Sequence, residues 1–237
     1  MSVGAIVLLV CSIGSNFYLL FSLRERYHNE KIRAVFPVPL DENSYNPPDS
    51  EIKKRILLLG DSRIAQWSNL PEIDGIEFIR RGVKGETSAQ LRLRITQELE
   101  VVGPDYVILQ IGINDLVAAG IAPALEQKIA RQLKDNYMYL LDECQKGNIG
   151  IYLLTIIHPD TPPLYRLPFW SSRIPLLVDE INQWLLDYIR KKYNITVLDS
   201  NYIFTSAPGD IKKIYKDTLH LNDKGYKILN KAIENIL

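Results

Sequence analysis

Five short apolar runs, separated by longer segments, constrain the fold of this chain more than any other feature of its sequence. They occupy residues 55–59, 76–79, 106–111, 151–156 and 195–198. Short apolar runs that lack polar alternation are typical of strands buried on both faces of a parallel sheet. The chain is therefore expected to build a sheet of five such strands.

The segments between these runs carry apolar residues at helical spacing, within residues 91–102, 125–144, 174–188 and 226–236. Gly147 is a candidate C-cap and Asn222 a candidate N-cap. Strands that alternate with helices and are joined by right-handed crossovers form an α/β fold. We predict a three-layer α/β/α sandwich around a five-stranded parallel sheet. Ligands of such folds bind beyond the carboxyl ends of the strands, so the residues that follow each strand are the functional candidates.

The charges of the chain balance, with 28 Lys and Arg against 28 Asp and Glu in 237 residues. A balanced surface gives no electrostatic footprint for nucleic acid. A hydrophobic fraction of 46% is too high for a disordered chain. We therefore expect a folded protein without a nucleic-acid partner.

Cysteines and histidines are few. The two cysteines, Cys11 and Cys144, cannot build a disulfide framework or a cysteine-based zinc cluster. The three histidines are His28, His158 and His220, and no two of them stand with a carboxylate at metal-ligand spacing. We expect no metal and no cofactor, and any catalytic histidine must be one of these three.

Residues 3–23 contain no charged side chain, and 15 of these 21 residues are hydrophobic. Such a stretch covers a hydrocarbon core of roughly 30 Å, so we predict a transmembrane anchor over residues 1–23 and single-pass membrane localisation. A cleaved signal peptide, a lipoprotein signal and a buried core helix are the alternatives. Val10 rather than a small residue precedes Cys11, which disfavours the lipoprotein signal. Basic residues follow the stretch and argue for a cytoplasmic domain, whereas anchored domains often face outward, so the side of the membrane stays open.

Residues 24–50 are expected to form a juxtamembrane tether, because residues 34–50 hold four of the 13 prolines together with several turn formers. Residues 51–237 then carry 24 Lys and Arg against 23 Asp and Glu. No charge asymmetry marks a further boundary within this part, which we expect to be one domain.

Gly60, Asp61 and Ser62 follow the first apolar run directly. Glycine permits a sharp turn from strand to helix, and a serine at the start of that helix has its hydroxyl close to unpaired backbone N–H groups. Taken alone, the tripeptide is also explained as an ordinary helix N-cap.

Two further strand ends carry candidate hydrogen-bond donors. Gly85 follows the second run in a stretch with two glycines in four residues, which allows close approach of the backbone to a ligand. Asn114 follows the third run and could direct its amide into a cleft, although an Asx turn that caps the next helix is the alternative.

Asp217 and His220 stand before the last helical segment. A carboxylate three residues before a histidine can accept a hydrogen bond from the ring Nδ1–H and support the imidazolium that forms when Nε2 takes a proton. Together with Ser62, these residues supply a nucleophile, a base and an orienting acid at one edge of the sheet.

With these residues the chain resembles the SGNH, or GDSL, hydrolase family over roughly residues 54–237. The four blocks of the family match Gly60-Asp61-Ser62, Gly85 in the sequence KGETS, Gly112-Ile113-Asn114-Asp115, and Asp217-Thr218-Leu219-His220. The resemblance implies a flavodoxin-like SGNH hydrolase fold for residues 51–237. It implies catalytic roles for Ser62, Asp217 and His220, and an oxyanion hole made by the N–H groups of Ser62 and Gly85 and the amide of Asn114.

The resemblance implies a serine esterase or acylhydrolase, which cleaves a carboxylic ester through an acyl-enzyme at Ser62. With the anchor expected at residues 1–23, the enzyme would be membrane-anchored. The substrate stays open between a lipid acyl ester and an acetyl group on a glycan. An acyltransferase and a non-catalytic anchored binding protein are further alternatives. The expected partners are a small-molecule, lipid or glycan ester and the membrane, and the sequence does not predict the oligomeric state.

Two residues depart from the family pattern. Arg63 follows the serine, and Glu86 stands where an aspartate is common. A cation beside the nucleophile would favour an anionic group in the substrate, so Arg63 bears on substrate preference.

Other polar residues receive non-catalytic interpretations. His158 is expected in the cleft wall or its loop, Cys144 as a buried thiol on a helix stripe, and His28 as a solvated side chain. Asp61 and Asp115 are expected to stabilise turns.

Residues 158–175 are long for a connection between a strand and a helix, and they mix prolines with aromatic residues. Such a loop at the ligand-binding end of a sheet can be a wall or lid of the substrate pocket. Contact with a membrane and a simple surface excursion are the alternatives.

Overall fold

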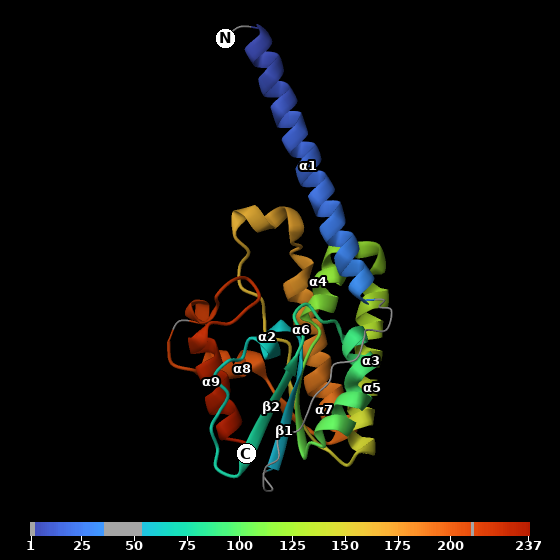
Figure 1. The fold of residues 1–237 in the computed structure, drawn as a ribbon, viewed down its shortest axis with the longest axis vertical. Helices are drawn as coiled ribbons and strands as arrows, with labels where there is room; N and C mark the ends of the chain where they lie inside the picture. The colour runs from blue at the N-terminus through green and yellow to red at the C-terminus, as the bar shows by residue number, and fades with distance from the viewer. Residues whose placement is uncertain (1–2, 36–53, 210) are drawn as a thin grey trace.

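A computed structural model describes residues 3–35, 54–209 and 211–237 of the chain (Figure 1). Its five strands are β1 (Lys54–Gly60), β2 (Ile76–Gly82), β3 (Tyr106–Gln110), β4 (Gly150–Leu154) and β5 (Thr196–Leu198). They form one parallel sheet in the order β2-β1-β3-β4-β5. The predicted five-stranded parallel sheet is therefore confirmed. Four of the five strands match the predicted apolar runs to within about two residues at each end. The observed β2 extends three residues beyond its predicted run, to Gly82.

Helices connect the strands and cover both faces of the sheet (Figure 1). The longer ones are α1 (Val3–Val35), α3 (Ser88–Val102), α4 (Ile113–Ile121), α5 (Glu126–Lys146), α6 (Arg173–Trp184) and α9 (Asp223–Glu234). The shorter ones are α2 (Ser62–Ala65), η1 (Pro123–Leu125), η2 (Leu164–Phe169), η3 (Leu185–Ile189), α7 (Arg190–Tyr193), α8 (Ser200–Ser206) and η4 (Ile211–Ile214).

Alternate side chains of the central strands pack against the helical layers on the two faces of the sheet. Leu57 and Leu109 pack in a core cluster with residues of α3, α4, α5 and α6. Ile56 and Ile108 pack in a second cluster with residues of α2, α8 and α9. A strand that buries both sets of its side chains must lie between two helical layers, so the three-layer α/β/α sandwich is confirmed.

Burial on both faces holds only for the middle of the sheet. β1 and β3 are buried along most of their length, whereas the edge strands β2 and β5 are partly exposed. The apolar runs could not distinguish the two cases, because an edge strand of a parallel sheet is still covered by helices on its faces.

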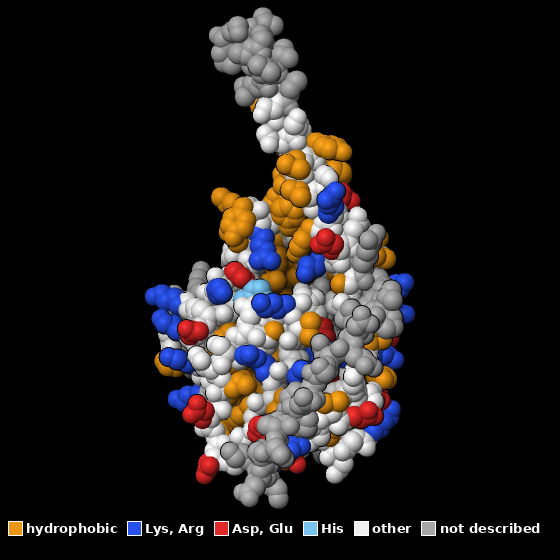
Figure 2. Space-filling model, viewed as in Figure 1, with side chains coloured by type: hydrophobic (Ala, Val, Ile, Leu, Met, Phe, Trp, Pro, Cys, Tyr) orange, Lys and Arg blue, Asp and Glu red, His pale blue; other side chains and the backbone are white. Residues whose placement is uncertain are grey.

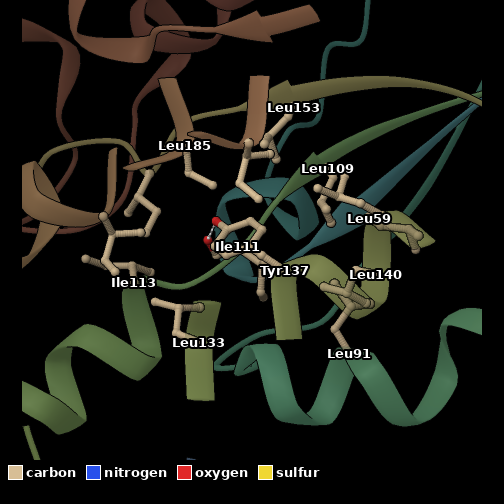
Figure 3. Close-up of a cluster of buried hydrophobic side chains, with 14 of the residues drawn as sticks. Leu59, Leu91, Leu109, Ile111, Ile113, Leu133, Tyr137, Leu140, Leu153 and Leu185 are labelled. Atoms are coloured by element: carbon tan, nitrogen blue, oxygen red, sulfur yellow. Dashed lines mark hydrogen bonds between the residues drawn. The ribbon is translucent and has the colours of Figure 1, made fainter. Parts of the chain in front are cut away.

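Tyr137 of α5 ties the larger core cluster to the end of β3. Its ring is fully buried, and its hydroxyl donates a hydrogen bond to the carbonyl oxygen of Ile111 (Figure 3). This bond satisfies a buried hydroxyl at the point where the chain leaves the sheet towards α4.

Both predicted helix caps are found. Gly147 is the C-cap of α5, and the side chain of Asn222 accepts hydrogen bonds from the N–H groups of Lys224 and Gly225 at the start of α9. These caps stop the two helices at the places that the sequence pattern indicated.

The C-terminal half of α1 packs against the rest of the protein, on α3, α4 and η2. Arg24 Nε donates to the carbonyl oxygen of Pro168 over 3.0 Å, and Thr87 Oγ1 donates to the carbonyl oxygen of Ala34 over 2.7 Å. The rings of Tyr27 and Phe169 meet edge to face at 5.7 Å. Residues 24–35, which we expected in the tether, are thus helical and in contact with the domain, whereas residues 36–50 lie outside the described residues.

The expectation of a transmembrane helix and single-pass membrane localisation is corrected. In the part of the chain that the structure describes, no helix is both long enough and apolar enough to cross a bilayer. Polar residues such as Asn16 interrupt the described apolar stretch of α1, and charged residues begin at Arg24. The side chains of residues 1–11, which the expected anchor included, lie outside the described residues.

Large apolar side chains nevertheless remain exposed where α1 leaves the domain. They include Phe17, Tyr18 and Phe21 on α1, and Leu164 and Tyr165 on η2. Figure 2 shows hydrophobic side chains gathered on this part of α1 and on the neighbouring η2.

His28 is buried rather than solvated, with 9% of its surface exposed. It lies on the part of α1 that packs on the domain, a contact that its sequence neighbourhood did not reveal. Burial lowers the pKa of His28, and the nearby charge of Arg24 lowers it further.

Candidate active site

Ser62 is the first residue of α2 and lies directly beyond the carboxyl end of β1. Gly60 makes this turn possible, because a Cβ atom there would lie 1.8 Å from the carbonyl oxygen of Gln110 on the neighbouring strand. Asp61 is the N-cap of α2, and its Oδ1 accepts a hydrogen bond of 2.9 Å from the N–H of Arg63. Asp61 therefore stabilises the turn, as expected, and is fully buried behind the serine.

Ser62, His220 and Asp217 form a continuous hydrogen-bonded chain. Ser62 Oγ lies 2.9 Å from His220 Nε2, and His220 Nδ1 lies 2.8 Å from Asp217 Oδ2 and 3.0 Å from Oδ1. Ser62 and His220 are 158 positions apart in the sequence, yet their side chains are within hydrogen-bonding distance. The three side chains have the order of a nucleophile, a base and an orienting carboxylate.

Asp217 is held in place by its own loop. Its Oδ1 accepts hydrogen bonds from the N–H groups of Leu219 (2.8 Å) and His220 (3.0 Å). Partial burial by itself would raise the pKa of Asp217, but these bonds and the His220 ring outweigh it, so the pKa lies below its ordinary value. The carboxylate is therefore ionised and fixes the ring so that Nε2 faces the serine.

The three predicted oxyanion donors lie at neighbouring strand ends. Asn114 is buried in the first turn of α4, and its Nδ2 donates to the carbonyl oxygen of Glu86 over 2.9 Å, which places the amide beside Gly85. Gly85 has a φ of +77°, and a Cβ atom there would meet nothing within 4 Å. Among the described residues, the N–H groups of Ser62 and Gly85 have no protein acceptor. The arrangement can thus offer two N–H groups and the second Nδ2 hydrogen of Asn114 to an oxyanion.

Asp115 braces the turn that carries Asn114. Its two carboxylate oxygens accept hydrogen bonds from the N–H (2.9 Å) and the Oγ (2.6 Å) of Ser88 at the start of α3. Complete burial raises the pKa of Asp115 to about 6, against the lowering effect of these bonds. The role is structural, as expected, and the bonds to Ser88 also join α4 to α3.

Arg63 is buried and does not present its charge to solvent beside Ser62, which corrects the expectation that it bears on substrate preference. Its side chain is 1% exposed, and its Nε donates a hydrogen bond of 2.9 Å to the carbonyl oxygen of Leu219. The hydroxyl of Tyr226 donates to the Arg63 carbonyl oxygen over 2.8 Å. Arg63 thus connects the serine helix to the histidine loop.

Glu86 belongs to a buried ion-pair cluster beneath the second strand end. Its carboxylate accepts hydrogen bonds of 2.6 and 2.7 Å from Arg94, which also reaches Glu98 at 2.7 Å. Burial raises the pKa of Glu86 to about 7, although Arg94 opposes this shift. The carboxylate is occupied by Arg94, and Glu86 contacts the site through its carbonyl oxygen, which accepts the hydrogen bond from Asn114.

The remaining candidates are not part of the triad. His158 pairs with Asp179 of α6, at 3.2 Å from Nε2 to Oδ1. Because Asp179 belongs to another element, the sequence around His158 did not indicate this pair. Cys144 is buried in α5, as expected, and burial raises the pKa of its thiol to about 12. Residues 158–175 include η2 and contact α1 through Pro168 and Phe169.

The sequence analysis missed one charged residue at this site. Lys31 of α1 places its Nζ 3.5 Å from Asn114 Oδ1. It lies before the first strand and outside every motif, so only the packing of α1 on α4 brings it to the site.

Comparisons with known proteins identify the sequences and structures that this chain resembles. The model of the GDSL-like Lipase/Acylhydrolase family matches residues 58–228, which include all the candidate site residues of the four strand ends. An uncharacterized lipoprotein of Bacillus subtilis (strain 168), YqeF, is 27% identical over 193 residues, which cover 72% of this chain and 78% of that protein.

Solved structures share the fold. A GDSL-like lipase from Bacteroides thetaiotaomicron is 22% identical, with a TM-score of 0.59 over 78% of this chain and 89% of that chain. A catalytic mutant of an acetylxylan esterase from Geobacillus stearothermophilus is 17% identical, with a TM-score of 0.60 over 77% of this chain and 93% of that chain. At these identities the similarity shows the fold alone.

Proposed function

The chain belongs to the GDSL-like lipase/acylhydrolase family, whose members act on ester bonds, and we propose that it cleaves a carboxylic ester through an acyl-enzyme at Ser62. The observation that carries this proposal is the distance of 2.9 Å between Ser62 Oγ and His220 Nε2, with Asp217 on the other ring nitrogen. A serine hydroxyl needs such a base, because it is a weak nucleophile at its own pKa.

In the proposed first step, Ser62 Oγ attacks the ester carbonyl carbon while its proton passes to His220 Nε2. The carbonyl oxygen becomes an oxyanion, which the N–H groups of Ser62 and Gly85 and the amide of Asn114 stabilise. Collapse of this intermediate breaks the bond to the alcohol, which leaves with the proton from Nε2.

In the second step, water replaces the alcohol. His220 Nε2 takes a proton from the water as its oxygen attacks the acyl carbon, and returns it to Ser62 Oγ when the carboxylic acid leaves. The ionised Asp217 supports the imidazolium in both steps without taking the proton itself.

The catalytic unit in this proposal is residues 51–237, together with the part of α1 that packs on it. Two alternatives for the reaction remain. One is an O-acetyl esterase acting on a glycan, the activity named for the acetylxylan esterase that shares the fold. The other is an acyltransferase, which would pass the acyl group to a sugar hydroxyl in place of water.

The test combines a covalent probe with a substrate series, on the full-length protein. A fluorophosphonate probe is expected to label Ser62, located by mass spectrometry of the labelled peptide, and Ser62→Ala is expected to lose both labelling and hydrolysis of 4-nitrophenyl acetate. Ser68→Ala, at an exposed serine after α2, is the matched control and retains both. Labelling at another residue, or hydrolysis by Ser62→Ala at the wild-type rate, would overturn the proposal.

The length of the acyl chain separates the candidate substrates. An acyl-chain pocket gives kcat/KM values that rise from acetate to octanoate, whereas a deacetylase loses activity beyond a few carbons. Product analysis with an added sugar acceptor distinguishes transfer from hydrolysis.

A further inference from the structure

Two cations from segments outside the four motifs lie near each other on α1 and η2, and one of them, Lys31, is next to the candidate oxyanion hole. Lys31 Nζ is 3.5 Å from Oδ1 of Asn114, and Nδ2 of the same amide is the candidate oxyanion donor. Arg166 of η2 is close enough to Lys31 for its charge to lower the pKa of the lysine. Figure 2 shows Lys and Arg side chains beside a histidine, on the face below α1.

Neither cation is neutralised by a carboxylate in the described part of the chain. No carboxylate of these residues lies within 4.0 Å of Lys31 Nζ, which instead faces Asn114 and, at 5.8 Å, the ring of Tyr27. The guanidinium of Arg166 likewise has no described carboxylate partner and lies 5.5 Å from the ring centre of Trp170. The acidic groups that act on Lys31 from further away are Asp61, which is fully buried, and Glu30, which is exposed on α1.

Both side chains are half-buried, which makes their unpaired charges costly. Burial lowers the pKa of Lys31, and the like charge of Arg166 adds to this effect. Two like charges that are partly removed from water and lack counter-ions repel each other, and a bound anion relieves this repulsion.

The segments that carry the two cations are fixed to each other and to the domain. Arg24 bonds to the carbonyl oxygen of Pro168, and the ring of Tyr27 packs on Phe169. Thr87, at the start of α3, bonds to the carbonyl oxygen of Ala34 near the end of α1. The segments that carry the two charges are therefore held in place before any ligand binds, which lowers the entropy cost of binding.

We propose that Lys31 and Arg166 form an anion-binding subsite, which takes a carboxylate or phosphate carried by the ester substrate close to its scissile carbonyl. This inference rests on the proposed esterase function, because it assigns the charge of that enzyme's substrate. The selectivity for an anion then comes from Lys31 on α1 and Arg166 on η2. Arg63, next to the nucleophile in sequence, is buried in the protein interior.

The test compares matched pairs of charged and neutral esters. One pair places the anion on the acyl side, as 4-nitrophenyl hemisuccinate against the neutral 4-nitrophenyl succinamate. The other places it on the alcohol side, as monoacetylglycerol phosphate against monoacetylglycerol. The readout is the charged-to-neutral ratio of kcat/KM, and the pair that shows the preference identifies the side of the ester that carries the anion.

We expect the wild-type protein to prefer the anionic member of at least one pair. Lys31→Met and Arg166→Met should each reduce that ratio by about tenfold, and Lys31→Arg should retain most of it, because the charge is kept. Lys191→Met is the matched control, since this exposed lysine on α7 precedes β5 and lies at the opposite end of the sheet. Its ratio should equal that of the wild type.

Two outcomes would overturn the subsite. One is an unchanged ratio in a folded Lys31→Met/Arg166→Met protein. The other is an equal loss for the charged and neutral esters, which would make Lys31 only a positioning residue for Asn114.

Binding measurements on Ser62→Ala separate this proposal from the esterase function. Calorimetry on Ser62→Ala, with and without the Lys31 and Arg166 substitutions, measures the affinity for the same ester pairs in the absence of turnover. If the wild-type protein hydrolysed none of the esters and escaped the fluorophosphonate probe, the esterase proposal would fail. The affinity ratio on Ser62→Ala would still decide whether the anion subsite exists.

Discussion

The Nε of Arg63 donates a hydrogen bond of 2.9 Å to the carbonyl oxygen of Leu219, the residue before His220. The serine helix and the histidine loop, which are far apart in sequence, are therefore joined next to the reacting atoms. Arg63→Met removes this bond and leaves the Leu219 carbonyl oxygen unpaired. Because small displacements of a base are costly, we expect kcat to fall by about 10- to 100-fold with little change in KM.

A positioning role for Arg63 is separated from a purely structural one by two comparisons. Tyr226→Phe removes the hydroxyl that donates to the Arg63 carbonyl oxygen, so it should reduce thermal stability while leaving most of kcat. Arg63→Lys should restore part of the lost kcat, because an ammonium group can also donate to Leu219. A stability loss in Arg63→Met with an unchanged kcat would argue against the positioning role.

Asp217→Asn tests the orienting carboxylate. The amide is neutral and cannot support an imidazolium, so we expect kcat to fall by about 10²- to 10⁴-fold. The fluorophosphonate labelling rate of Ser62 should fall in parallel, because it depends on the same base. Asp135→Asn, at an exposed position of α5, is the control for the substitution itself. Wild-type turnover by Asp217→Asn would remove Asp217 from the triad.

Asn114→Ala tests the oxyanion hole. Loss of one oxyanion donor costs about 2.7–4 kcal/mol of transition-state stabilisation, so kcat should fall by about 10²- to 10³-fold with a small effect on KM. Asn69→Ala, at an exposed asparagine, should behave as the wild type. An increase in KM without a loss of kcat would show that Asn114 binds the substrate equally in the ground state and the transition state.

The sheet and the order of the site residues could be predicted because their signals are local. An apolar run such as residues 106–111 identifies a buried strand by itself, and the parallel arrangement brings its carboxyl end to the same edge as that of β1. Asp217 and His220 are only three residues apart, so their contact needs a single turn of chain. For Ser62, the required turn is indicated by Gly60, two residues earlier.

The direction of individual side chains could not be predicted in the same way. Arg63 follows Ser62 in the sequence, yet its side chain enters the interior because the Leu219 carbonyl oxygen is available there. Lys31 and His28 stand in the segment that we expected to be a tether, and their places depend on how α1 packs on α3 and α4. Contacts between elements far apart in the chain leave no periodic or spacing pattern in the sequence.

Asp115 makes the stability of the protein depend on pH. Complete burial raises its pKa from 3.8 to about 6, so the folded protein binds this proton more tightly than the unfolded chain does. The contribution of Asp115 to the free energy of unfolding is therefore fully present below about pH 4 and is lost as the pH rises through about 6. The loss amounts to at most about 3 kcal/mol. Asp115→Asn cannot ionise, so its free energy of unfolding, measured with urea between pH 4 and 7.5, should fall less with pH than that of the wild type. The changed bonds to Ser88 shift the free energy of unfolding of the variant by the same amount at every pH. Parallel plots of the free energy of unfolding against pH for the two proteins would show that Asp115 does not titrate in this range.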